Sequence, residues 1–127
     1  MNFKRKIIIF IDWYLPGYKA GGPIRSVANL ISRLKEEFEF FVVTRDTDYG
    51  ENTSYPGIKS DEWVLSTDGT KVFYFSEKKI SQGNFHKVIR DVKPDVIYIN
   101  GIYSYKFSIL PLLLSGKLNI DRIVVAP

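Results

Sequence analysis

The chain alternates short apolar runs with longer segments whose apolar residues recur every three or four positions. Residues 6–12 form the first run, which is rich in β-branched side chains and lacks strict alternation, as is typical of a strand covered on both faces. Residues 23–38 place their apolar side chains on one helical stripe, and residues 40–44 form a second apolar run. This order predicts a strand, a helix and a parallel strand joined by a right-handed crossover.

The middle of the chain is polar and then changes to short strand-like segments. Residues 45–60 are rich in Asp, Thr, Gly and Tyr and predict an exposed loop. Residues 62–65 and 70–75 flank the pair Asp68-Gly69, which is a strong turn signal. Two arrangements remain open for residues 70–75: the second arm of a hairpin, or the third parallel strand of the sheet.

The last third of the chain returns to the alternating pattern. A helix is expected to begin at Ser81, which suits an N-cap, and to end before Pro94. A strand, a helix that Pro111 kinks or divides, and a final strand are predicted at residues 95–99, 105–118 and 122–126. Strands that alternate with helices predict an α/β domain: a Rossmann-like, open, mainly parallel sheet flanked by helices.

Composition narrows the possible classes of protein. The chain has 127 residues, which is enough for one domain, and 45% of them are hydrophobic, which argues against disorder. It has no cysteine, so disulfides, cysteine zinc sites and thiol nucleophiles are excluded. The net charge of +4 suits phosphate-bearing ligands, nucleic acid or an anionic membrane, and equally a mildly basic domain.

Two glycine-containing turns are expected at one rim of the sheet, because ligands of open α/β sheets bind beyond the carboxyl ends of the strands. Gly21 and Gly22 precede a predicted helix, whose free N–H groups and dipole suit a phosphate. Their spacing is neither a dinucleotide fingerprint nor a Walker A loop. Asn100 and Gly101 follow another strand. The alternative roles are structural: glycines that satisfy positive φ, and an asparagine that caps a helix.

Other polar residues give weaker signals. His86 is the single histidine and is predicted to lie near a helix surface, so we assign it no role. Asp46, Asp48 and Glu51 lie close together in the polar loop, but their spacing is not that of a calcium site, and solvated charge is the expectation. We therefore predict no metal site, no cofactor and no catalytic residue within this chain.

Several segments, taken in order, match one pattern: Ile7-Ile8-Ile9-Phe10, Pro16, Gly21-Gly22, Val27-x-x-Leu30-x-x-x-Leu34, Phe41-Val42-Val43-Thr44, Lys93-Pro94-Asp95-Val96-Ile97-Tyr98-Ile99-Asn100 and Arg122-Ile123-Val124-Val125-Ala126-Pro127. This order resembles the start of family 4 glycosyltransferases and covers nearly the whole chain. The family often reads Pro-Asp-Val-Ile-His-x-His in the segment that corresponds to Lys93–Asn100, whereas Tyr98 and Asn100 stand here in place of the histidines.

The resemblance implies a GT-B enzyme with two Rossmann-like domains that face each other across a cleft. Residues 1–127 would be the N-terminal, acceptor-side domain, and the C-terminal nucleotide-sugar domain would lie outside this chain. Gly21 and Gly22 would then lie near the donor diphosphate. Asn100, Gly101 and Tyr103 would line the acceptor side, and Tyr14 and Lys19 would contact the acceptor or a phosphate.

The implied reaction transfers a sugar from a nucleoside diphosphate sugar to a hydroxyl acceptor, usually with retention and without a required metal. The acceptor would be a carbohydrate or a lipid-linked molecule in cell-surface polysaccharide or glycolipid synthesis. We expect a cytoplasmic protein with peripheral contact to the inner face of the membrane, helped by Lys4-Arg5-Lys6 and by the aromatic residues of the loop at 13–18. This chain alone is predicted to be inactive.

Two other classes of protein fit the sequence less well. A stand-alone Rossmann-like or flavodoxin-like domain that binds a ligand or regulates a partner is the main alternative. The chain stops directly after a predicted strand, without a covering helix, and this favours a truncated transferase over that alternative. A nucleic-acid binder is not expected, because the basic residues are scattered and no stacking motif is present.

Overall fold

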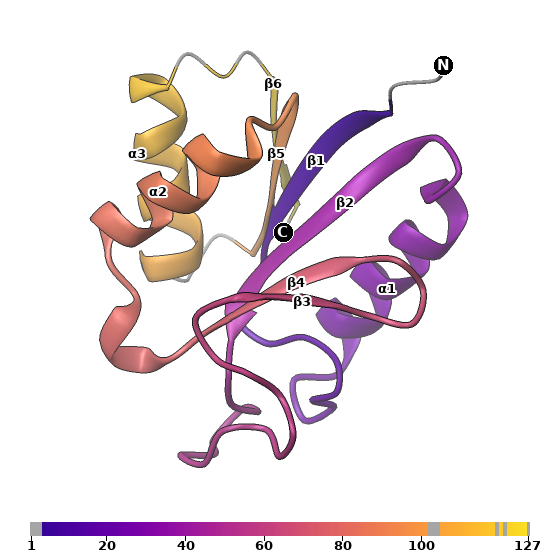
Figure 1. Cartoon of the computed structure of the whole chain (residues 1–127), viewed down its shortest axis with the longest axis vertical. Helices are drawn as coiled ribbons and strands as arrows, with labels where there is room; N and C mark the ends of the chain where they lie inside the picture. Colours follow the sequence, from indigo (N-terminus) through magenta and orange to yellow (C-terminus); the bar gives the residue numbers. More distant parts are fainter. Residues whose placement is uncertain (1–3, 102–104, 119, 121, 127) are drawn as a thin grey trace.

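A computed structural model describes residues 4–101, 105–118, 120 and 122–126. Within these residues, six strands form one open sheet in the order β3-β4-β2-β1-β5-β6 (Figure 1). The strands are β1 (Arg5–Phe10), β2 (Phe38–Arg45), β3 (Trp63–Leu65), β4 (Lys71–Phe75), β5 (Val96–Asn100) and β6 (Arg122–Ala126). All neighbouring strands pair in parallel except β3, which runs antiparallel to β4 at one edge. The protein therefore has a Rossmann-like α/β fold, as the sequence predicts.

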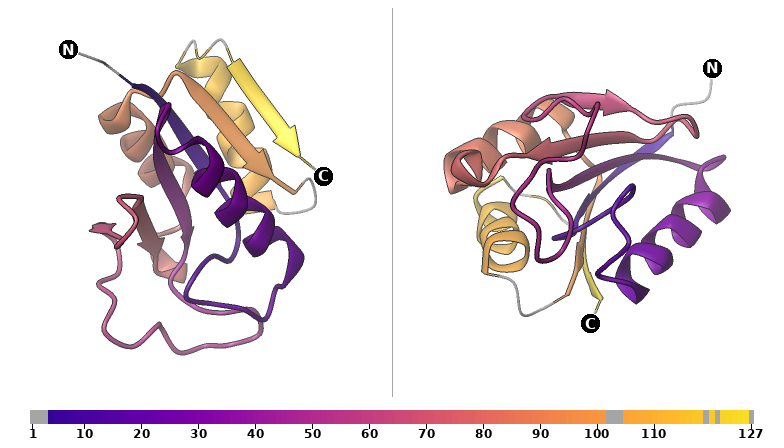
Figure 2. Two further views of the ribbon diagram at one scale, coloured as in Figure 1. Left: turned by 90° about the vertical axis from the view of Figure 1, so that its right-hand side faces the viewer. Right: turned by 90° about the horizontal axis from the view of Figure 1, so that it is seen from below.

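Helices cover both faces of the sheet. They are α1 (Gly22–Leu34), α2 (Gln82–Val92) and α3 (Leu110–Lys117). Figure 2 shows α1 on one side of the strands and the pair α2 and α3 on the other. Alternate residues of β1 supply the two cores: Ile8 packs with the α2 and α3 side chains, whereas Ile9 packs with those of α1. Both side chains are completely buried, as expected for a strand that is covered on both faces.

Local chemistry fixes the ends of two helices. Gly21, with φ of 71°, precedes α1, and Pro23 lies in its first turn, where a missing N–H costs nothing. The hydroxyl of Ser81 accepts a hydrogen bond from the backbone N–H of Asn84 at 3.1 Å and so caps α2. Lys93, in the left-handed conformation with φ of 55°, ends α2.

Both alternatives for residues 70–75 prove correct. β3 and β4 form a hairpin across Asp68-Gly69, where Gly69 has φ of 90°. β4 also pairs in parallel with β2 and thereby joins the main sheet. Residues 46–62 contain neither helix nor strand and form the predicted loop.

Proline divides the last helical segment. A π-helical turn, η2 (Tyr105–Ile109), leads into α3, and Pro111 lies in the first turn of α3. A short 3-10 turn, η1 (Glu77–Lys79), connects β4 to α2. Among the described helices, none combines the length and the apolar character needed to span a bilayer.

Candidate functional site

A pocket of about 440 Å³ opens at the carboxyl end of the sheet, and we call it the carboxyl-rim pocket. Its lining comes from the loop after β1, the start of α1, the loop after β2 and the end of β5. The lining residues are Ile11, Asp12, Trp13, Lys19, Ala20, Pro23, Tyr49, Asn100 and Gly101. Residues almost 90 positions apart in the chain therefore meet here, where open α/β sheets generally bind ligands.

The structure brings most of the predicted site residues to this pocket. Lys19, Asn100 and Gly101 line it directly. Gly21 and Gly22 are exposed at its border, between the lining residues Ala20 and Pro23. The two glycine-containing turns therefore lie at the same rim of the sheet, as predicted from the sequence. Tyr103 is outside the described residues.

Tyr14 lies apart from this group. Its side chain is only 4% exposed and packs in the α1-side core, so the structure does not bring it to the pocket. Burial also raises the pKa of its hydroxyl well above the usual range. The hydroxyl of Tyr55 donates a hydrogen bond to the backbone carbonyl of Tyr14 at 3.2 Å. This bond and the packing of the Tyr14 ring attach the glycine loop to the core.

Asp48 holds the glycine loop against the loop that follows β2. As a residue, Asp48 is 8% exposed, and its carboxylate accepts hydrogen bonds from the backbone N–H groups of Tyr18 at 3.2 Å, Lys19 at 3.3 Å and Tyr49 at 2.8 Å. Burial alone would raise the pKa of Asp48, but these N–H groups stabilise its charged form, and the pKa lies below the usual aspartate range. Two pocket residues, Lys19 and Tyr49, thus depend on one carboxylate.

The expectation of solvated acids at residues 46–51 is wrong for Asp46 and Asp48. Asp46 is 8% exposed and accepts a hydrogen bond from the hydroxyl of Ser60 at 2.7 Å. Asp46 thus accepts from a side-chain hydroxyl, whereas Asp48 satisfies backbone N–H groups of the loops, which need acceptors when they are removed from water. Glu51 is exposed and pairs with Lys19. No group of three metal-ligating side chains occurs among the described residues.

An aromatic pair lies in the pocket lining. The rings of Trp13 and Tyr49 meet edge to face, with centroids 4.9 Å apart. The guanidinium of Arg45 lies 5.7 Å from the centre of the Trp13 ring, within the range of a cation–π contact. His86, by contrast, is half-buried on α2, on the other side of the sheet.

A chain of charges connects the rim to the α2 and α3 side. Arg45, at the end of β2, approaches Asp12 at 3.7 Å and pairs with Glu77. Lys106 of η2 also reaches Glu77, at 2.6 Å. The hydrogen bond from Lys106, together with the charge of Arg45, lowers the pKa of Glu77. Ion pairs thus connect Asp12, next to Trp13, with Arg45 at the end of β2 and with Glu77 after β4.

Sequence reasoning assigned no site role to Asp12, Trp13, Arg45 or Tyr49. The available signal for Asp12 and Trp13 was their position directly after a buried strand. Comparison of the chain with protein-family models, with curated proteins and with solved structures finds no match. A functional proposal for this chain therefore rests on the carboxyl-rim pocket and on the sequence pattern.

Proposed function

We propose that this chain is the N-terminal, acceptor-side domain of a GT-B glycosyltransferase, which transfers a sugar from a nucleoside diphosphate sugar to a hydroxyl acceptor. The observation that carries this proposal is the meeting of the two glycine-containing turns at one pocket, which includes Lys19 and Ala20 on one side and Asn100 and Gly101 on the other. The sequence pattern that resembles family 4 glycosyltransferases assigns substrate contacts to these same turns.

The chemistry of the pocket suits a carbohydrate. Trp13 and Tyr49 offer aromatic surface to the apolar face of a sugar ring. The carboxylate of Asp12 accepts hydrogen bonds from hydroxyl groups, and the amide of Asn100 both donates and accepts them. A pocket with apolar walls and a few convergent polar groups is the usual form of a small-molecule site.

The start of α1 suits the diphosphate of a donor. Backbone N–H groups at a helix N-terminus and the positive end of the helix dipole favour an anion. Gly21 and Gly22 have no side chain, and a Cβ at either position would meet nothing within 4 Å, so the backbone is open to a ligand there. In the parent enzyme, the second domain would supply most of the donor contacts. A carbohydrate or lipid-linked acceptor and action at the cytoplasmic face of the membrane belong to the same proposal.

Tryptophan fluorescence offers a direct test of carbohydrate binding. The chain has two tryptophans, and Trp63 packs between Phe41 and Phe73, away from the pocket lining. In a Trp63→Phe background, Trp13 becomes the only tryptophan. We expect a saturable change in its fluorescence on titration with a member of a panel of acceptor glycans.

Pocket variants make this test specific. Asn100→Ala and Tyr49→Ala should weaken glycan binding, on the order of tenfold for each lost polar or aromatic contact. Asn29→Ala, at an exposed position on α1, is the matched control and should bind normally. The proposal is refuted if no glycan changes the Trp13 signal, or if binding is the same in the Asn100 and Asn29 variants. Binding of a nucleotide or flavin without any glycan would favour the stand-alone binding domain.

A further inference from the structure

A second pocket lies at the opposite, amino end of the sheet, and we call it the amino-rim pocket. It has a volume of about 570 Å³. Its lining comes from the starts of β1, β5 and β6, the end of α2 and the α3–β6 connection. The lining residues are Arg5, Ile89, Arg90, Lys93, Pro94, Asp95, Leu118, Ile120 and Arg122. Because β1, β5 and β6 run parallel (Figure 1), the lining residues place this pocket and the carboxyl-rim pocket at opposite rims of the same sheet.

The described lining of the amino-rim pocket has four cationic side chains and one carboxylate. Arg5, Lys93 and Arg122 form no ion pair within the described part of the chain. Among the described residues, the ion-pair partner of Arg90 is the exposed Asp91, at 3.7 Å. Among the described lining residues, positive charge therefore exceeds negative charge, and such an excess attracts anions.

Asp95, the single carboxylate of the lining, is held by the backbone. It accepts a hydrogen bond from the N–H of Lys6 at 2.8 Å, and its own N–H donates to the carbonyl of Lys6 at 2.8 Å. These bonds join the start of β5 to β1. Asp95 thus has a structural partner, and it offsets only part of the positive charge around the pocket.

The helix dipole explains some of these cations but not all of them. Arg90 and Lys93 lie at the carboxyl end of α2, where positive charge is favourable in any helix. Arg5 and Arg122 are the first residues of strands β1 and β6, so a helix dipole does not explain their positive charge. Three arginines around one opening also provide planar, forked donors that match phosphate oxygens.

Apolar side chains complete the lining. Ile89 is 1% exposed, and Leu118 and Ile120 are partly buried against the same core. A ligand with a phosphate group and an adjacent apolar part would place its charge among the cations and its apolar part on these residues. We propose that the amino-rim pocket binds a phosphate-bearing anion of this kind, either a soluble phosphate ester or the head group of an anionic lipid.

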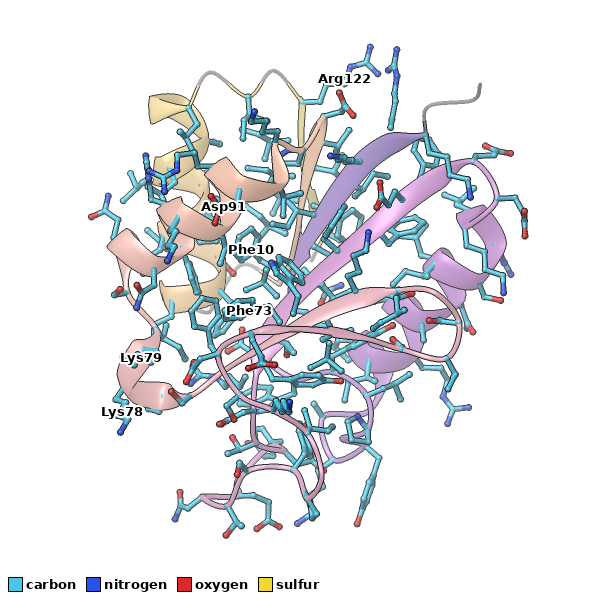
Figure 3. The ribbon with its side chains drawn as sticks, in the orientation of Figure 1. Phe10, Phe73, Lys78, Lys79, Asp91 and Arg122 are labelled. Atoms are coloured by element: carbon cyan, nitrogen blue, oxygen red, sulfur yellow. The ribbon has the colours of Figure 1, made fainter. Side chains whose placement is uncertain are left out.

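The first experiment titrates the chain with inorganic pyrophosphate at low salt and follows backbone amide signals by NMR. We expect saturable shifts around the amino-rim pocket. Arg90→Gln combined with Arg122→Gln should weaken binding about tenfold, because two charges near the anion are removed. Lys78→Gln combined with Lys79→Gln removes the same charge from η1, which lies far from Arg122 (Figure 3), and should leave binding unchanged.

A substitution that should tighten binding distinguishes a loss of anion contacts from a loss of protein stability. Asp95→Asn keeps an oxygen that accepts the Lys6 N–H but removes the negative charge. Pyrophosphate binding should then tighten, about threefold. A variant that merely damages the fold would weaken binding instead.

Vesicle sedimentation distinguishes the two sources of phosphate. Vesicles of phosphatidylglycerol are compared with vesicles of phosphatidylcholine, with the same variants. Retention on phosphatidylglycerol that the Arg90/Arg122 variant loses identifies a lipid head group, whereas pyrophosphate binding without vesicle retention identifies a soluble ester. Either result supports phosphate binding at the amino-rim pocket. That proposal is refuted if neither probe binds, or if the Lys78/Lys79 variant loses as much binding as the Arg90/Arg122 variant.

Discussion

Asp48 is the residue whose replacement tests most directly how the carboxyl-rim pocket is built. Its carboxylate is 8% exposed and accepts the backbone N–H groups of Tyr18, Lys19 and Tyr49. Asp48→Ala leaves these N–H groups without their acceptor. Hydrogen bonds to charged groups contribute about 1.5–3 kcal/mol each, but the loop lies near the surface, and water would replace part of what is lost.

We therefore expect Asp48→Ala to lower the free energy of unfolding by about 2–3 kcal/mol, a large part of the roughly 5–15 kcal/mol typical of a domain. Asp48→Asn should cost less, about 1–2 kcal/mol, because one oxygen remains as an acceptor. Urea unfolding measures both values. Asp91→Ala is the control, since Asp91 is exposed on α2 and has only a distant contact with Arg90.

The pH dependence gives an independent check on Asp48. Because its pKa is lower in the folded than in the unfolded chain, Asp48 stabilises the fold above the ordinary aspartate pKa of about 3.9, and this contribution is lost as the pH falls through the lower, folded value. The difference in stability between the native chain and Asp48→Asn should therefore shrink in acid. A difference that stays constant from neutral to acidic pH, or equal costs for Asp48→Ala and Asp91→Ala, would refute the anchoring role.

Three further predictions concern the same fold. Gly17→Ala should lower the free energy of unfolding in urea by about 2 kcal/mol, because a Cβ there would collide with the Tyr55 hydroxyl. Gly83→Ala should instead raise it by about 0.5–1 kcal/mol, because a Cβ at this position on α2 would meet nothing within 4 Å. Ser81→Ala should lower the free energy of unfolding by about 1 kcal/mol through loss of the α2 cap, and the difference should be absent if the cap is not formed. Burial raises the pKa of Tyr74 to about 12, so stability should fall as the pH rises above about 10, where the unfolded tyrosine ionises first. The chain has eight tyrosines, so the native chain is compared with Tyr74→Phe; a difference in phenolate absorbance between the two near pH 10 would contradict the burial of Tyr74.

The secondary structure could be predicted because it depends on neighbouring residues. The helical stripe of α1, the Ser81 cap and the Asp68-Gly69 turn are all readable within a few positions of the chain. The predicted adjacency of Gly21 and Asn100 followed from one further rule, that parallel strands end at the same rim.

The interactions that hold the site could not be predicted in the same way. Asp48 meets Tyr18 across 30 positions, and Arg45 meets Glu77 across 32. In the sequence, Asp48 is one acid in a polar loop, and only the packing of that loop against the glycine loop makes it buried. For Tyr14, the family resemblance implied a substrate contact, whereas the structure places its side chain in the core, which the local sequence does not reveal.

The position of the two pockets provides a final test of both proposals together. The completely buried residues Ile8, Ile9 and Ile97 lie in the sheet between the two rims. Effects at sites that are well separated and share no partner are generally additive. Asn100→Ala should therefore change glycan binding without changing the pyrophosphate-induced NMR shifts around the amino-rim pocket, and the Arg90/Arg122 variant should weaken those shifts without changing glycan binding. If either variant weakened binding at both rims, the measured losses would reflect a damaged sheet, and neither pocket could be assigned its ligand from these substitutions.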